Sequence, residues 1–281
     1  MKGCETMIRK LQWACIGLAV ISAAILIYQF VNPEDLPEAP ETAIRQPIVR
    51  DIPAEAVPRI PTRPTDEPTD PATEFIPSPE LLPRIVGLRE YYDNPDIVGY
   101  IYVPGTTISY PVAQTGNNEF YLYFDLHWER SRAAAVFVDY ENNLYLMEDD
   151  STIIFGHNMR NGTKFHAVRH FHREDFFREH TYILLDTPYR ETVWDIFSFF
   201  HTTIAFDYIR TSFRSRDDFY EFLRELERRS IFTTDIELSP EDQILILSTC
   251  GVAGGPNRYV VVARLRPDEC ALIADEIANE Y

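Results

Sequence analysis

The chain has 281 residues, of which 45% are hydrophobic, and it carries a formal net charge of −18. That length and apolar content suffice for one sizeable domain with appendages. The acidic balance argues against a nucleic-acid-binding role, because a phosphate-binding face needs an excess of lysine and arginine. The four cysteines form no disulfide framework and no zinc-binding CxxC pair. A single disulfide between Cys250 and Cys270 is one possibility if the domain lies in an oxidising compartment.

An apolar stretch occupies residues 13–31, close to the N-terminus. As a helix it would reach roughly 28 Å, close to the thickness of a bilayer core. Basic residues precede it and acidic residues follow it, which predicts a cytoplasmic segment at 1–12 and an extracellular remainder. A cleaved signal peptide is the alternative, but no small-x-small cleavage site follows the stretch. The sequence therefore predicts an uncleaved transmembrane signal anchor and a single-pass protein of the cell membrane.

Residues 32–83 are rich in proline and contain no glycine. They hold thirteen of the 20 prolines in the chain. Proline fixes φ and removes a hydrogen-bond donor, so this composition predicts an extended, semi-stiff extracellular linker. Such a linker would hold a globular domain, residues 84–281, away from the membrane.

The predicted domain is mainly β. Eight runs are rich in β-branched and aromatic residues and are bounded by turn residues. So many strands in succession suggest a closed or nearly closed eight-stranded β-barrel with peripheral helices. The predicted strands cover residues 97–105, 108–113, 133–141, 151–157, 182–187, 192–204, 243–250 and 258–267.

Three predicted helices interrupt these strands. They cover residues 80–92, 165–179 and 215–228. The third has the clearest pattern, because apolar residues recur at helical spacing at positions 219, 222, 223 and 226. Ser215 would cap its start, with Asp218 as the reciprocal partner of a capping box. This pattern predicts an amphipathic helix packed on the barrel, before the strand that carries Cys250.

Cys250 ends a strand-like apolar run, ILILSTC, and a glycine-rich turn follows it. A nucleophilic cysteine needs a nearby base or cation to shape its ionisation. His157 ends another apolar run, and Arg258 opens the strand after Cys250. The three side chains could meet at the barrel rim, where a guanidinium would stabilise an oxyanion. The plainer interpretation is a small core cysteine, with a turn histidine and a surface arginine.

His166 and His170 lie four residues apart and are followed by His172, a spacing that could clamp a metal ion on a helix. The metalloprotease pattern needs a glutamate directly after the first histidine, where this chain has Ala167. We therefore interpret these histidines as solvated helix positions, and we expect neither a metal nor another cofactor.

Taken together, these motifs resemble those of the sortases, the membrane-anchored cysteine transpeptidases of Gram-positive bacteria. The family signature, T/S-L-x-T-C at a strand end, reads here as Leu247-Ser248-Thr249-Cys250, with His157 upstream and Arg258 downstream. The resemblance covers nearly all of residues 80–267 and is specifically to class B. It rests on NPDIVGYIYVPGTTISYPVAQ, AAAVFVDYENN, IIFGHNMRNGTKFHAV and SIFTTDIELSPEDQILILSTC. The predicted helix at 215–228 resembles the extra helix characteristic of that class.

The resemblance implies a mechanism. Cys250 would attack the carbonyl after the threonine of a C-terminal sorting signal, often an N-P-x-T-N-like pentapeptide in class B, and form a thioester. His157 would protonate the leaving amine and deprotonate the incoming one, while Arg258 would stabilise the oxyanion. The accepting amine would belong to a peptidoglycan precursor or to a pilin lysine. The expected substrate-binding residues are Asn158, Ser248 and Thr249.

Other interpretations compete with this one. Pilin-polymerising sortases often carry an Asp-Pro-aromatic lid and a C-terminal membrane helix, but here Ala72 follows Asp70-Pro71 and the C-terminus is polar. Papain-like peptidases place the cysteine before the histidine, and L,D-transpeptidases use a His-Gly-Cys-type signature that is absent here. A non-catalytic, membrane-anchored binding module would tolerate loss of the three motif residues, and their presence favours an enzyme. The loop GVAGGPN lacks the acidic and aromatic residues that many class B members carry after the cysteine.

Overall fold

The computed structural model of the protein describes residues 39–40, 42–48, 80–250 and 257–267. The predicted segments at 1–12 and 13–31 lie outside these ranges, as do most of the predicted linker and Cys270. Within the described ranges, no helix is long and apolar enough to cross a membrane. The chain divides into two compact units, Met1–Ala39 and Pro40–Tyr281, and every helix and strand named below belongs to the second.

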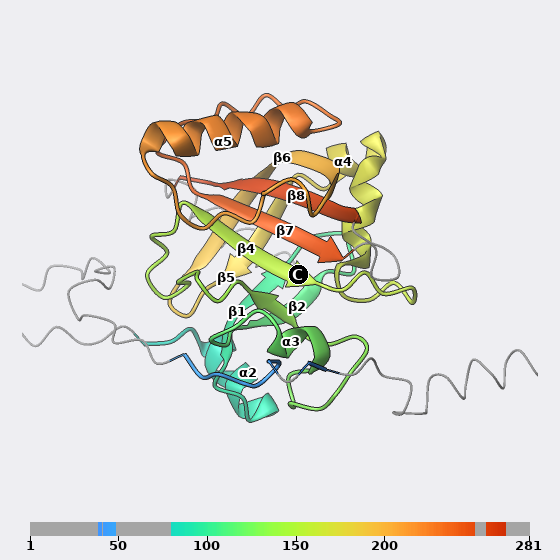
Figure 1. Ribbon diagram of the computed structural model, residues 1–281, viewed down its shortest axis with the longest axis vertical. Coiled ribbons are helices and arrows are strands. Elements are labelled where there is room, and N and C mark those ends of the chain that lie inside the picture. The colour runs from blue at the N-terminus through green and yellow to red at the C-terminus, as the bar shows by residue number, and fades with distance from the viewer. Residues whose placement is uncertain (1–38, 41, 49–79, 251–256, 268–281) are drawn as a thin grey trace, which may run out of the picture. The chain divides into compact units, whose positions relative to one another are not determined.

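The predicted strands are all present in the structure. They are β1 (Ile97–Tyr102), β2 (Ser109–Ala113), β3 (Val136–Val138), β4 (Ser151–Gly156), β5 (Tyr182–Asp186), β6 (Glu191–Thr203), β7 (Ile244–Cys250) and β8 (Asn257–Leu265). They close into a barrel in the order β1-β2-β3-β4-β7-β8-β6-β5, which confirms the predicted mainly β fold (Figure 1). Two of the pairings, β2 with β3 and β4 with β7, are parallel, and the others are antiparallel.

Strand β3 is much shorter than the predicted run of residues 133–141. Ala134 has φ 49°, a left-handed conformation that interrupts a strand. At the other end the chain turns, because the Asn142 amide donates to the Asp139 carbonyl oxygen at 3.1 Å. The apolar residues around β3 therefore pack as a loop rather than as strand.

The helices differ from the prediction in two places. They are α2 (Pro83–Tyr92), α3 (Phe120–Tyr123), the 3₁₀ helix η2 (Phe165–His172), α4 (Glu174–Glu179) and α5 (Arg216–Arg229). The single helix predicted at 165–179 is two helices, because Arg173 is extended with φ −93° and ψ 131°. The one-turn helix α3 was not predicted, since four residues are too few to show a period.

The sheet around β7 is buried on both faces. Leu245 and Leu247 face the barrel interior, where they pack with residues from most of the other strands. Ile244 and Ile246 face outward and pack against the apolar side of α5, which lies over this part of the sheet (Figure 1). Successive residues of a strand point to opposite faces, so two buried faces explain why β7 reads as an unbroken apolar run.

The N-terminus of α5 is capped as predicted on one side only. The Asp218 amide donates to Ser215 Oγ at 3.2 Å. The Asp218 carboxylate, however, accepts from the Arg214 amide at 3.0 Å and from the Arg210 guanidinium at 2.9 Å. The predicted return contact of the capping box, from the Asp218 carboxylate to the Ser215 amide, is therefore wrong. The carboxylate instead binds the Arg210 guanidinium and the Arg214 amide.

Replacing Ser215 by alanine is expected to lower the free energy of unfolding by about 1 kcal/mol, because the Asp218 amide loses its side-chain acceptor. Ser215→Thr keeps a hydroxyl acceptor and is the matched control. Urea denaturation followed by circular dichroism measures both variants. Unfolding midpoints that are equal in Ser215→Ala and the unmodified chain would show that the cap contributes nothing.

Candidate active site

The parallel pairing of β4 with β7 brings His157 and Cys250 to neighbouring positions. Gly156 is the register partner of Thr249, and each of the two candidate residues comes directly after its strand's paired residue. On the other side of β7, Cys250 is itself the antiparallel partner of Arg258 in β8. The three candidate catalytic residues therefore occupy adjacent positions in a row along one edge of the sheet.

A pocket of ≈ 240 Å³ lies at this edge. Its walls are formed by the α3 region, by β3, β4, β7 and β8, and by the connection from β6 to α5. Its lining residues are Asn118, Leu122, Phe137, Phe155, Gly156, His157, Tyr208, Ile209, Ser248 and Arg258. Apolar walls with a few convergent polar groups are typical of a ligand-binding pocket.

His157 is half-buried in this pocket and is held by a backbone contact. Its Nε2 atom lies 3.0 Å from the carbonyl oxygen of Leu122 in α3. Burial lowers the pKa of His157 below its ordinary value of 6.5. The Leu122 carbonyl acts in the opposite direction, and the nearby Lys164 charge adds to the lowering. A histidine whose pKa lies near or below neutrality can both accept and donate a proton.

The turn after β4 holds the backbone of His157 in place. The Phe165 amide donates to the His157 carbonyl oxygen at 2.9 Å, and a β-bridge joins Asn158 to Lys164. Gly156 is required at this point, because a Cβ atom there would lie 2.6 Å from the Phe165 ring. The glycine thus lets the ring of Phe165 pack directly beneath the end of β4.

Arg258 stands at the start of β8, half-buried, between β7 and β6. Its Nη1 atom donates to the carbonyl oxygen of Asn257 at 2.9 Å, and Thr202 is its register partner in β6. The guanidinium carries several N–H donors in a planar fork, which suits it to hold a carbonyl oxygen or an oxyanion.

The structure separates the three residues that were expected to bind substrate. Ser248 lines the pocket, and its Oγ atom lies 2.8 Å from the Tyr208 hydroxyl. Thr249 is fully buried and sits on the opposite face of β7 from Ser248. Asn158 belongs to the turn after β4, where its Oδ1 atom lies 3.0 Å from His166 Nδ1, outside the residues that line the pocket.

The histidines of η2 do not line the pocket. The rings of His166 and His170 are 5.2 Å apart and edge-on, while His172 is exposed. In the part of the chain that the structure describes, no group of three or more histidine, cysteine, aspartate or glutamate residues could hold a metal ion.

Sequence reasoning missed several residues of the pocket. Tyr208 lies in the connection between β6 and α5, which has no periodic pattern, and Leu122 contributes a backbone oxygen, which no side-chain motif can reveal. Asn118 also belongs to no sequence motif. Both the nitrogen and the oxygen of its side-chain amide are hydrogen-bonded. It donates to Asp139 Oδ2 at 2.7 Å and accepts from the Tyr140 amide at 2.9 Å.

Comparison with known proteins decides the family. Residues 101–266, more than half of the chain, match the family described as Sortase domain. The chain belongs to the sortase family. Among curated relatives, sortase B of Staphylococcus aureus is 35% identical over 174 residues, which are 61% of this chain and 71% of that protein. Sortase B of Listeria monocytogenes is 34% identical over 157 residues, which are 56% of this sortase and 63% of the relative.

Solved structures agree with this assignment. A Staphylococcus aureus sortase B–substrate complex superposes with a TM-score of 0.63 at 33% identity, covering 66% of this chain and 86% of that one. Clostridium perfringens sortase B superposes with a TM-score of 0.60 at 37% identity, covering 64% and 98%. This sortase is therefore of class B and is a cysteine transpeptidase, which confirms the resemblance seen in the sequence. The pilin-joining and non-catalytic alternatives are not favoured.

His157 is expected to make stability depend on pH. Because burial lowers its pKa in the folded state, the unfolded chain binds this proton more tightly. The resulting contribution to stability is present above about pH 6.5 and is lost as the pH falls through the lower folded pKa. His157→Gln should therefore reduce the loss of stability on acidification, measured as urea midpoints across that range. His127→Gln, at an exposed histidine, is the control, and an unchanged pH dependence in His157→Gln would contradict the prediction.

Proposed function

We propose that this sortase cleaves a C-terminal sorting signal on a secreted protein and transfers the protein to an amine of the cell wall. Cys250, His157 and Arg258 are its catalytic residues. The observation that carries the proposal is the strand register, which sets these three positions side by side at the edge of one pocket.

In the first half of the reaction, the Cys250 sulfur forms a bond to the carbonyl carbon of the signal's threonine residue. The peptide bond breaks, and its nitrogen leaves with a proton supplied by His157, which gives a thioester and a free amine. In the second half, the incoming amine gives a proton to His157 and displaces the thiolate. The proton balance closes over the two steps, so the cysteine and histidine act as one coupled pair.

Arg258 stabilises the negative charge that develops on the carbonyl oxygen. Its position opposite Cys250 in the β7–β8 pairing supports this role. When the Cys250 sulfur bonds to the carbonyl carbon, the attached oxygen must lie within hydrogen-bond reach of the guanidinium. A preorganised cation at that point acts on the transition state more than on the bound substrate.

The walls of the pocket suggest how the signal is bound. Leu122, Phe137 and Phe155 offer apolar surface, while Asn118 and Ser248 offer hydrogen-bonding groups. A signal of the N-P-x-T-N type presents the same mixture of a proline ring and polar side chains. In this proposal Ser248 contacts the signal. Thr249, on the buried face of β7, helps to hold the end of the strand that carries Cys250. Asn158 helps to form the turn after His157.

We further propose that residues 13–31 anchor this sortase in the cell membrane, with 1–12 in the cytoplasm and the catalytic domain at 84–281 outside. We propose the amine of a peptidoglycan precursor as the acceptor. The distribution of basic and acidic residues around the apolar stretch supports this orientation. Ile44 and Arg45, in the predicted linker, contact the catalytic domain.

Cys250→Ala is expected to abolish thioester formation without unfolding the barrel, because the nucleophile is lost from the end of a strand that stays paired. The full chain in detergent is incubated with N-P-x-T-x and related peptides, and intact mass is recorded. An adduct that disappears with hydroxylamine identifies both the thioester and the motif. Cys270→Ala is the matched control and should form the adduct normally. Adduct formation by Cys250→Ala would overturn the mechanism.

Arg258→Lys is expected to slow thioester formation by about 10²-fold, because lysine keeps the charge but not the planar fork that holds the oxyanion. Arg264→Lys is a suitable control, since Arg264 stands in the same strand and also donates to a backbone carbonyl, that of Glu237, at 2.9 Å. Single-turnover rates with a saturating peptide measure both variants. Equal rates in the two would remove Arg258 from the catalytic set.

A further inference from the structure

Part of the predicted linker is not a free spacer, because residues 42–48, here called the N-terminal strap, lie against the catalytic domain. Three consecutive strap residues each bond to it. The Ile44 carbonyl accepts from Asn117 Nδ2 at 2.7 Å, and the Gln46 carbonyl accepts from the Gly116 amide. Between them, the Arg45 side chain reaches Asp96. The strap is therefore attached through both its backbone and its one arginine.

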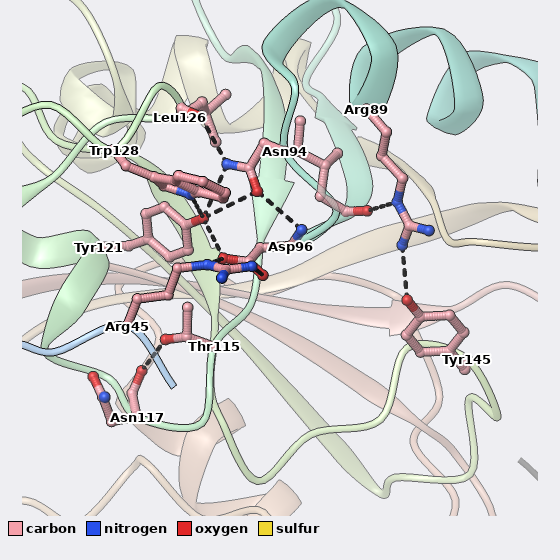
Figure 2. A network of polar contacts seen from close by, with 11 residues as sticks. Arg45, Arg89, Asn94, Asp96, Thr115, Asn117, Tyr121, Leu126, Trp128 and Tyr145 are labelled. Carbon is pink, nitrogen blue, oxygen red and sulfur yellow. Dashed lines mark hydrogen bonds and ion pairs between the residues drawn. The ribbon is translucent and has the colours of Figure 1, made fainter. Parts of the chain in front are cut away.

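Arg45 makes the strongest of these attachments (Figure 2). Its Nε and Nη2 atoms donate to the two carboxylate oxygens of Asp96 at 2.7 and 2.6 Å, and its guanidinium lies 4.3 Å from the centre of the Trp128 ring. The Asp96 side chain is 5% exposed and that of Arg45 27%. A two-point ion pair stacked on an aromatic ring and largely withdrawn from water is one of the stronger polar contacts a surface segment can make.

The same carboxylate connects Arg45 to helix α3. Tyr121, a residue of α3, donates its hydroxyl to Asp96 Oδ2 at 2.9 Å and accepts from Trp128 Nε1 at 3.3 Å (Figure 2). Burial, and then the charge of Asp96, raise the pKa of the Tyr121 hydroxyl well above its ordinary value. The hydroxyl therefore stays protonated and remains a donor to Asp96. Arg45, Asp96 and Tyr121 form one chain of contacts from the strap to α3.

A second chain of contacts reaches the start of α3. The Oδ1 atom of Asn117 accepts from the amides of Glu119 and Phe120, both at 2.9 Å, at the first turn of the helix. The Nδ2 atom of the same side chain donates to the strap at Ile44. Gly116 lets the strap approach this closely, because a Cβ atom there would lie 2.9 Å from the Cβ atom of Gln46.

Helix α3 in turn carries the backbone oxygen that contacts His157. Leu122 follows Tyr121 in α3, and its carbonyl lies 3.0 Å from His157 Nε2. A helix of a single turn has little stability of its own, because nucleating it fixes more dihedral angles than its hydrogen bonds repay. The position of the Leu122 carbonyl therefore depends on what holds α3 from outside.

We propose that the N-terminal strap, through Arg45, positions His157 by holding α3 against the edge of the pocket. Arg45 is a positioning residue, since it acts through Asp96 and Tyr121 and does not line the pocket. The inference rests on the proposed role of His157 in proton transfer. It gives the segment before the catalytic domain a part in the reaction.

The first test uses the full chain with Arg45→Ala. The rate of thioester formation is expected to fall about tenfold or more, because a small displacement of a proton donor is costly in rate. Arg84→Ala is the matched control. Arg84 also donates to a buried aspartate, Asp186, at 2.6 Å, and its guanidinium lies 5.1 Å from the Tyr100 ring. Arg84→Ala removes an ion pair away from α3 and should leave the rate per folded molecule within about twofold.

A second pair of variants displaces the strap without touching either member of the ion pair. Gly116→Ala adds a methyl group that collides with Gln46, whereas at Gly87, in α2, an added Cβ atom meets nothing within 4 Å. Gly116→Ala is expected to slow thioester formation in the same direction as Arg45→Ala, and Gly87→Ala to leave it unchanged. Normal rates in both Arg45→Ala and Gly116→Ala would overturn the inference.

The pKa of His157, followed by NMR of the isotope-labelled imidazole, separates positioning from loss of stability. The contact with the Leu122 carbonyl raises this pKa, while burial and the nearby Lys164 charge lower it. Displacing α3 changes both the burial of His157 and its contact with Leu122, so it should shift the His157 pKa in Arg45→Ala but not in Arg84→Ala. A slower reaction with an unchanged pKa would overturn positioning through His157. A shifted pKa with an unchanged rate would support the strap contact and instead count against the proton-transfer role of His157.

Discussion

The site depends above all on the parallel pairing of β4 with β7. Parallel neighbours need a long crossover, and here η2, α4, β5, β6 and α5 all lie between the two strands in the chain. The pairing sets both carboxyl ends at one edge, so that His157 follows β4 where Cys250 ends β7. The hairpin from β7 to β8 adds Arg258 to the same row. Backbone hydrogen bonds, rather than side-chain contacts, thus fix the spacing of the three groups.

Helix α5 contributes to the same site by what it leaves uncovered. It packs over the outward residues of β7 as far as Ile246, and Tyr208, from the segment before it, joins the same apolar cluster. Ser248, the next outward residue, contacts the Tyr208 hydroxyl and lines the pocket. Along the outer face of β7, Ile246 is therefore covered by α5, whereas Ser248, two residues later, lines the pocket. The apolar side of α5 thus buries the outer face of β7 up to the edge of the pocket.

The opposite wall of the pocket is built differently, from one helical turn and loops. Phe120 and Tyr121 of α3 pack into an apolar cluster, and polar contacts add to this packing. Asn118 is bonded on both sides of its amide, and Asp96 gathers the side chains of Arg45 and Tyr121. These contacts connect a segment that precedes the domain to the edge where His157 stands. A proline-rich composition predicted an extended spacer, yet the backbone carbonyls and the arginine of the strap attach it to the domain.

The sequence by itself determined the eight strands, the amphipathic helix α5 and the motif around Cys250, because each is written in local apolar spacing or in consecutive residues. Only the tertiary structure decided which strand ends meet, since register is set by backbone pairing between distant segments. It also decided that Thr249 faces the buried interior, that Tyr208 and the Leu122 carbonyl line or hold the site, and that the strap attaches at Asp96. These features arise from contacts between residues far apart in the chain, which leave no period or local motif in the sequence.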